Sequence, residues 1–184
     1  DLATSYMSPE TLTAMKHNMF TPGNYFYNGI GHVTVDYGKV ITYGYSEYVK
    51  EIEEELAGMR VSDANYCKKH ALLEAMLISL RAVIRYAKRY SRLAKEMAEK
   101  EQNGTRKAEL LKISENCDRV PESGARNFYE ACQSFWFIQM LIQVESSGHS
   151  ISPGRFDQYM YPFYKKSLDA GMTREQAQEY IDCI

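Results

Sequence analysis

The segment from Phe128 to Val144 constrains the fold of this chain more than any other. It reads Phe-Tyr-Glu-Ala-Cys-Gln-Ser-Phe-Trp-Phe-Ile-Gln-Met-Leu-Ile-Gln-Val, which predicts a helix that is apolar on nearly every side. A helix of this kind is stable only when other elements enclose it. A membrane span needs about 20 mostly apolar residues, and Gln139, Gln143 and Glu145 interrupt this run too early. We therefore predict a buried helix, within a body larger than 184 residues can supply.

Helical periodicity extends over most of the remaining chain. Ser62 or Asp63 is the expected N-cap of a very long helix that Asn103-Gly104 should end. Thr173 and Gln176 form a capping box for the last helix. Shorter helices are expected from Pro9 to Met15 after a Ser8 cap, Tyr37 to Gly58, Thr105 to Cys117 and Arg155 to Leu168. The sequence thus predicts a mainly α-helical protein.

Two glycine-rich loops interrupt this pattern and carry histidine. The first runs from Thr21 to Asp36 and contains Gly29-Ile-Gly-His32, with a short strand expected at Val33–Val35. The second contains Gly148-His149-Ser150. Glycine lets a backbone approach a ligand closely, and binding groups concentrate on loops held by a rigid scaffold. The residues by themselves indicate either a polar pocket lined by His32, His149 and Ser150, or histidines that only hydrogen-bond within turns.

Several common chemistries do not fit the sequence. The first loop lacks the third glycine of a dinucleotide-binding fingerprint, and neither Ser150 nor Ser152 lies in a Gly-x-Ser-x-Gly nucleophile elbow. The four cysteines show no close pairing, which argues against structural zinc and favours reduced thiols: Cys67, Cys117, Cys132 and Cys183. The formal net charge of −2 argues against a nucleic-acid partner. A small neutral or weakly charged partner fits better.

The two ends of the chain look like cuts. The sequence begins at Asp1 without an initiator Met, and it stops at Ile184 inside a helical pattern that no Gly, Asn or Pro closes. We therefore expect a piece of a longer protein.

Three stretches carry a family resemblance. They are the run from Thr21 to Val40, the run from Phe128 to Gln139, and Glu145-Ser-Ser-Gly-His-Ser-Ile-Ser-Pro-Gly-Arg-Phe-Asp-Gln-Tyr-Met-Tyr-Pro162. Together with Asp1-Leu-Ala-Thr-Ser-Tyr-Met7 they resemble the N-terminal part of the pyruvate formate-lyase-like glycyl-radical enzymes. The pattern is most like the B12-independent glycerol and propane-1,2-diol dehydratases.

This resemblance implies a fold and a domain assignment. Residues 1–184 would be a mainly α fragment of the ten-stranded α/β barrel of those enzymes, within the N-terminal pyruvate formate-lyase-like domain and truncated at both ends. The radical glycine domain and the catalytic cysteine loop would lie outside the chain, and none of the four cysteines matches the catalytic one. The full enzyme would be a carbon–oxygen hydro-lyase, whereas the fragment alone would be inactive.

The resemblance also implies cofactors and partners. The fragment would bind no cofactor and no metal, while the full enzyme would use a protein glycyl radical installed by an S-adenosylmethionine-dependent iron–sulfur activating enzyme. A small polyol substrate, that activating enzyme and a second identical subunit are the expected partners, without nucleic acid or membrane. The expected location is the cytoplasm, with a bacterial microcompartment as a variant of it.

Residue by residue, the resemblance assigns the site. His32 would protonate the departing hydroxyl, and His149 with Ser150 would hydrogen-bond the polyol. Arg155 and Asp157 also match the family run, and for them we expect a structural ion pair that fixes the second loop rather than contact with the substrate. Tyr25, Tyr27 and Asn28 would support the pocket wall. Alternatives are a choline trimethylamine-lyase, another glycyl-radical enzyme of this family, or a non-catalytic truncated chain; glycerol, propanediol and choline stay open as substrates.

Overall fold

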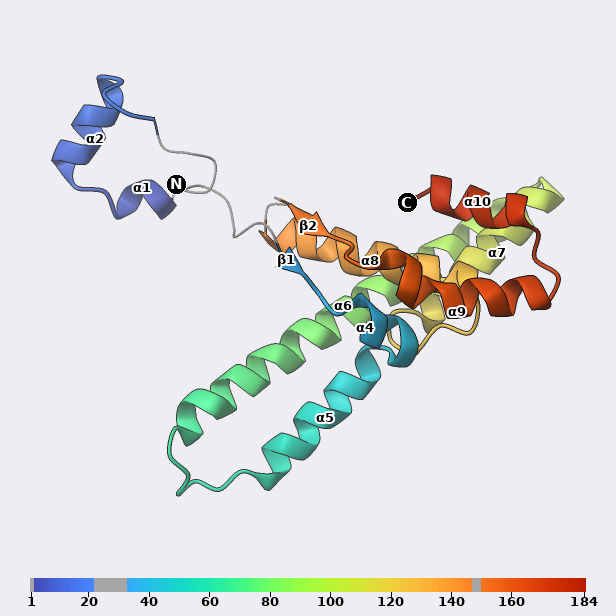
Figure 1. The fold of residues 1–184 in the computed structure, drawn as a ribbon, viewed down its shortest axis with the longest axis horizontal. Helices are drawn as coiled ribbons and strands as arrows, with labels where there is room; N and C mark the ends of the chain where they lie inside the picture. The colour runs from blue at the N-terminus through green and yellow to red at the C-terminus, as the bar shows by residue number, and fades with distance from the viewer. Residues whose placement is uncertain (1, 22–32, 147–149) are drawn as a thin grey trace. The chain divides into compact units, whose positions relative to one another are not determined.

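The structure is a computed structural model that describes residues 2–21, 33–146 and 150–184 (Figure 1). It divides into two units, which are described separately: residues 1–35 with 139–154, and residues 36–138 with 155–184. Helices dominate the described residues of both units, which confirms the predicted helical class.

The larger unit is entirely helical in its described part. Figure 1 shows α5 and α6 running side by side as a hairpin, with α7 folding back along the far part of α6. Its elements are α4 (Tyr37–Tyr43), α5 (Tyr45–Gly58), α6 (Tyr66–Lys100), α7 (Gly104–Arg119), the first part of α8 (Phe128–Ser146), α9 (Phe156–Asp169) and α10 (Arg174–Asp182).

Small side chains allow α6 and α7 to pack closely. The buried face of α6 along this contact consists of Ala87, Ser91, Ala94 and Ala98. The Ser114 hydroxyl of α7 donates to the Ser91 carbonyl at 2.8 Å, so the polar group in this buried face is paired. A buried hydroxyl without a partner would cost free energy, and this bond avoids that cost.

The predicted helix from Tyr37 to Gly58 is two helices, broken at Gly44, so that prediction was wrong. Gly44 has a φ of +83°, and a β-carbon there would lie 2.2 Å from the Glu122 carbonyl oxygen. The next two amides donate outside the helix, because Tyr45 N bonds to Pro121 O and Ser46 N bonds to Glu122 O, both at 2.9 Å. A distant loop thus ends α4 and starts α5.

The prediction that Ser62 or Asp63 is the N-cap of the long helix was also wrong. Helix α6 starts at Tyr66, its N-cap is Asn65 in the left-handed region, and that residue makes no capping bond with its side chain. Asp63 is used elsewhere, since its carboxylate accepts the Arg60 amide at 2.9 Å. Other predicted ends are confirmed: Ser8 caps α2, and Thr173 forms the capping box of α10.

The smaller unit contains α1 (Leu2–Ser5), α2 (Pro9–Lys16), the end of α8, and two strands, β1 (Val33–Thr34) and β2 (Ile151–Ser152). The two strands pair in parallel, with Val33 opposite Ile151. The short strand predicted at Val33–Val35 is therefore confirmed, whereas β2 was missed. These are the strands of the described residues, so the ten-stranded barrel is not visible there and stays a prediction.

Helix α8 is as enclosed in its first turns as the sequence predicts. Six apolar residues there are buried within the larger unit: Phe128, Ala131, Cys132, Phe135, Phe137 and Ile138. The Phe135 ring packs on Tyr37 of α4, with 5.0 Å between centroids, and edge-on against Phe156 of α9 at 5.1 Å. Trp136 departs from the pattern, with 42% of its surface exposed, and the predicted burial is wrong at the end of the helix, where Val144 is 76% exposed.

Exposed apolar side chains lead to a first prediction, that the 184-residue chain self-associates when expressed alone. Leu72 with Met76, and Leu93 with Met97, form two pairs one helical turn apart on α6, and all four residues are at least 41% exposed. Exposed apolar surface of this kind favours association. We expect elution well above the 21.2 kDa monomer in size-exclusion chromatography, together with binding of a hydrophobic dye. The double substitution Leu93→Glu with Met97→Glu should reduce both signals. A dye-negative monomer with one cooperative thermal transition would contradict the prediction.

Candidate active site

The predicted site residues are only partly covered by the structure. His32 and His149 lie outside the described residues, as do Tyr25, Tyr27 and Asn28. Ser150 is described and is exposed, with a φ of +56°. The roles assigned to His32, His149 and Ser150 therefore stay predictions.

The pairing of β1 with β2 brings two distant segments of the chain together. Val33 pairs with Ile151 and Thr34 with Ser152, in parallel (Figure 1). In the sequence, His32 immediately precedes Val33 and Ser150 immediately precedes Ile151. The two histidine-bearing loops thus lead directly into strands that are hydrogen-bonded partners. Sequence reasoning found the loops and β1 but missed β2, and with it this link, because the two residues of β2 are too few to show a strand period.

The backbone around β2 is unusual at both ends. Ser150 occupies the left-handed region, which is uncommon for a residue other than glycine and costs about 1–3 kcal/mol unless neighbouring contacts impose it. Gly154 also has a positive φ, of +65°, and a β-carbon there would lie 2.7 Å from Cγ2 of Thr34. The Gly154 amide donates to the Ser152 hydroxyl at 3.1 Å. Such local strain is typical of segments that position functional groups.

Helix α8 contributes one contact to this segment. The Gln139 side-chain amide donates from Nε2 to the Ile151 carbonyl at 3.3 Å, in a partly buried setting. Gln139, β1 and β2 all belong to the smaller unit. A helical side chain therefore holds the strand residue that directly follows Ser150.

The expected ion pair between Arg155 and Asp157 forms but is weak. Nε of Arg155 lies 3.8 Å from Oδ1 of Asp157, and the two side chains are 74% and 77% exposed. Exposed pairs of this kind contribute about 0–1 kcal/mol. This pair therefore does little to fix the loop.

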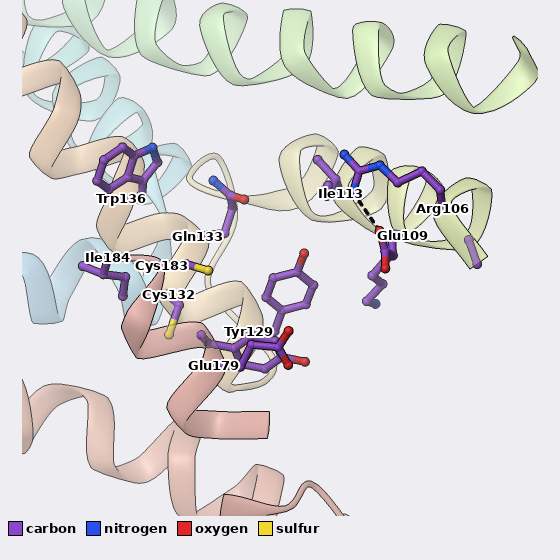
Figure 2. Close-up of a pocket in the computed structure, with 13 residues that line it drawn as sticks. Arg106, Glu109, Ile113, Tyr129, Cys132, Gln133, Trp136, Glu179, Cys183 and Ile184 are labelled. Carbon is purple, nitrogen blue, oxygen red and sulfur yellow. Dashed lines mark hydrogen bonds and ion pairs between the residues drawn. The ribbon is translucent and has the colours of Figure 1, made fainter. Parts of the chain in front are cut away.

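The larger unit has a separate hollow of about 690 Å³ between α7, α8 and α10 (Figure 2). Figure 2 shows Tyr129, Cys132 and Trp136 of α8 lining it, with Arg106 and Glu109 of α7 bonded to each other at its rim. The rings of Tyr129 and Tyr180 stack at 4.6 Å between centroids.

Three groups that line this hollow, Tyr129, Cys132 and Tyr180, are poorly suited to act as nucleophiles or bases. Burial raises the pKa of the Cys132 thiol to about 12, and it also raises the pKa of the Tyr129 and Tyr180 hydroxyls. All three therefore stay protonated near neutral pH, where a thiol nucleophile must be ionised. The segment around β1, β2 and Ser150 is the better candidate for the site.

In the described parts of the chain, no three side chains among His, Cys, Asp and Glu gather closely enough to hold a metal ion. None of the helices in those parts is both long and apolar enough to cross a bilayer.

Comparison with known proteins gives consistent matches along the chain. A family model described as "Pyruvate formate lyase-like" matches residues 1–184. Among curated proteins, an isethionate sulfite-lyase from Desulfovibrio desulfuricans is 45% identical over 152 residues, which is 81% of this chain. The match covers 18% of that relative, so this chain spans about a fifth of its length.

Two solved structures match nearly the whole chain. One, described as concerning 1,2-propanediol dehydration in Roseburia inulinivorans, is 60% identical, with a TM-score of 0.87. The other, a glycerol-bound B12-independent glycerol dehydratase from Clostridium butyricum, is 50% identical, with a TM-score of 0.86. Each match covers 99% of this chain and 23% of the solved chain.

Proposed function

This chain belongs to the pyruvate formate lyase-like family, and from that premise we propose that it is part of a glycyl-radical lyase that dehydrates propane-1,2-diol or glycerol to an aldehyde. The observation that carries the proposal is the 60% identity, over 99% of the chain, to the structure described as concerning 1,2-propanediol dehydration. The 50% identity to a glycerol dehydratase supports the same substrate class.

Within this proposal, residues 1–184 are part of the N-terminal pyruvate formate-lyase-like domain. The radical glycine, the catalytic cysteine and the barrel strands that the described residues lack lie elsewhere in a longer polypeptide. That polypeptide is a cytoplasmic homodimer, and its partner is an S-adenosylmethionine-dependent iron–sulfur activating enzyme.

In the proposed reaction, this chain supplies the proton for the departing hydroxyl. The glycyl radical and its cysteine, both outside the chain, remove a hydrogen atom from C1 of the diol. The hydroxyl on C2 must then leave as water, and it needs a proton to do so. His32 supplies this proton, because imidazole can donate near neutral pH.

In this proposal, the second loop binds the substrate. His149 and Ser150 hydrogen-bond the two hydroxyls of the diol, and a serine hydroxyl suits this task because it both donates and accepts. What supports this placement is that Ser150 directly precedes Ile151, which pairs with Val33, the residue after His32. The strained φ of Ser150 is consistent with a positioned functional group.

A second candidate function is cleavage of a carbon–sulfur bond. It is favoured by the 45% identity to an isethionate sulfite-lyase. A sulfonate carries a negative charge, which sites typically meet with a bidentate arginine. The described arginine that follows the second loop most closely in the sequence is Arg155. The diol is the favoured substrate because the identity to the structure concerning 1,2-propanediol dehydration, at 60% over 99% of the chain, is higher than the 45% over 81% of the chain to the sulfite-lyase.

The experiment compares four substrates on the full-length, anaerobically activated enzyme. Propane-1,2-diol, glycerol, isethionate and choline are supplied separately, and propionaldehyde, 3-hydroxypropionaldehyde, sulfite and trimethylamine are measured. We expect the highest kcat/KM for one of the two diols. Faster release of sulfite would assign isethionate as the substrate in place of a diol, and faster release of trimethylamine would assign choline.

A further inference from the structure

We propose that Gln139 is a positioning residue for Ser150, an inference that rests on the function proposed above. Its side-chain amide donates to the carbonyl of Ile151 at 3.3 Å. Ile151 is the residue after Ser150, and it is also the register partner of Val33. Gln139 thus bonds to the strand residue that follows the proposed diol-binding Ser150 and that pairs with β1.

The conformation of Ser150 explains why such a contact is needed. A serine with a φ of +56° relaxes to a more common conformation unless the residues around it are held. Ile151 is held in three ways: the residue is only 8% exposed, its backbone pairs with β1, and its carbonyl accepts the Gln139 bond. Loss of the Gln139 bond would loosen the strand residue nearest the strained serine.

The other end of the same segment is fixed by packing. The Gly154 backbone lies so close to Thr34 that a β-carbon would come within 2.7 Å of its Cγ2 atom. Segment 150–154 is therefore anchored at its end by β1 and near its start by Gln139. At the end of the segment the Gly154 amide donates to the Ser152 hydroxyl within the segment itself, whereas near its start the Gln139 bond comes from helix α8. Gln139 can therefore be replaced without introducing a β-carbon into the close contact at Gly154.

The chemical requirement at position 139 is a donor of the right length. A carbonyl oxygen accepts hydrogen bonds and does not donate them, so the partner must carry an N–H. Methionine matches the length of glutamine but cannot donate, whereas an ionised glutamate would place an acceptor against another acceptor. Gln139→Met and Gln139→Glu therefore remove the same bond in two different ways.

The test uses the full-length activated enzyme and a double-mutant cycle. We expect Gln139→Met to raise the KM for propane-1,2-diol by about 3- to 10-fold, the effect of one hydrogen bond, with a smaller change in kcat. Ser150→Ala should raise KM similarly. If Gln139 acts through Ser150, the double variant should be no worse than Ser150→Ala alone, because coupled residues are not additive.

The matched control is Gln143→Met, the same change one turn further along α8 at an exposed side chain. Its KM should equal that of the wild type. Effects that multiply in the double variant overturn the role of Gln139 while leaving the proposed function intact. A normal KM in Ser150→Ala overturns the proposed function of Ser150 and this inference together. If Gln139→Met does not fold, Gln139→Glu completes the same cycle.

Discussion

Replacing His32 by alanine in the full-length activated enzyme should lower dehydration of propane-1,2-diol by about 10²–10⁴-fold, the usual effect of removing a general acid. The glycyl radical should stay at its wild-type level. The reason is that the proposed acid acts on the departing hydroxyl, whereas the radical is stored on a separate loop outside this chain. The measurements are propionaldehyde formation under anaerobic conditions and the radical signal by electron paramagnetic resonance.

A second histidine, His17, supplies the control for this prediction. His17 is exposed, and its contribution to the fold is a backbone amide that ends α2. His17→Ala should therefore leave turnover and radical content unchanged. Unchanged turnover in His32→Ala would remove it from the acid role. A parallel loss of radical and activity would instead indicate that His32 supports the structure.

The helices could be predicted from sequence because their determinants are local. Apolar spacing and caps act over a few residues, so α8 and the capping box at Thr173 were found from the sequence. The break at Gly44 could not be found in this way. It depends on the Pro121 and Glu122 carbonyls, which accept the amides that a continuous helix would have used internally.

The candidate site could likewise be predicted only where its determinants are local in the sequence. Glycine and histidine in two aperiodic loops are visible in the sequence, and so is their resemblance to a known family. The pairing of Val33 with Ile151 is not visible, because strands of two residues exist only through a partner far away in the chain. The contact from Gln139 was missed for the same reason, since an apolar helix predicts burial but not which carbonyl its amide will reach.

A buried carboxylate holds the start of α8 in the larger unit. Glu130 has no exposed surface, and its Oε2 accepts the Arg126 amide at 2.7 Å, while its Oε1 accepts Nε of the same arginine at 2.9 Å. Nε of Arg119, at the end of α7, lies 3.5 Å from Oε2. Hydrogen bonds to Glu130 first, and then to Glu115, hold the pKa of Arg126 above its usual range. These contacts join α7, the loop after it and α8.

Glu130→Gln should therefore destabilise the start of α8 and the loop before it. The amide keeps the shape of the side chain but turns one acceptor into a donor that faces two arginines. Bonds to charged groups contribute about 1.5–3 kcal/mol each, and both guanidinium groups can regain water because Arg126 is 48% and Arg119 is 36% exposed. We expect local stability to fall by about 3 kcal/mol, which corresponds to roughly hundredfold faster hydrogen exchange of the amides in residues 130–138.

Glu115→Gln is the matched control, because Glu115 pairs with the same arginine on the outside of the molecule. Its Oε1 lies 2.9 Å from Nη2 of Arg126, and its side chain is 52% exposed. Water competes for both partners there, so the loss should be below about 1 kcal/mol. Exchange should be compared in the full-length protein, where the other elements of the fold are present. Equal exchange in the two variants would mean that burial of Glu130 adds nothing, and that α8 is held by its apolar contacts alone.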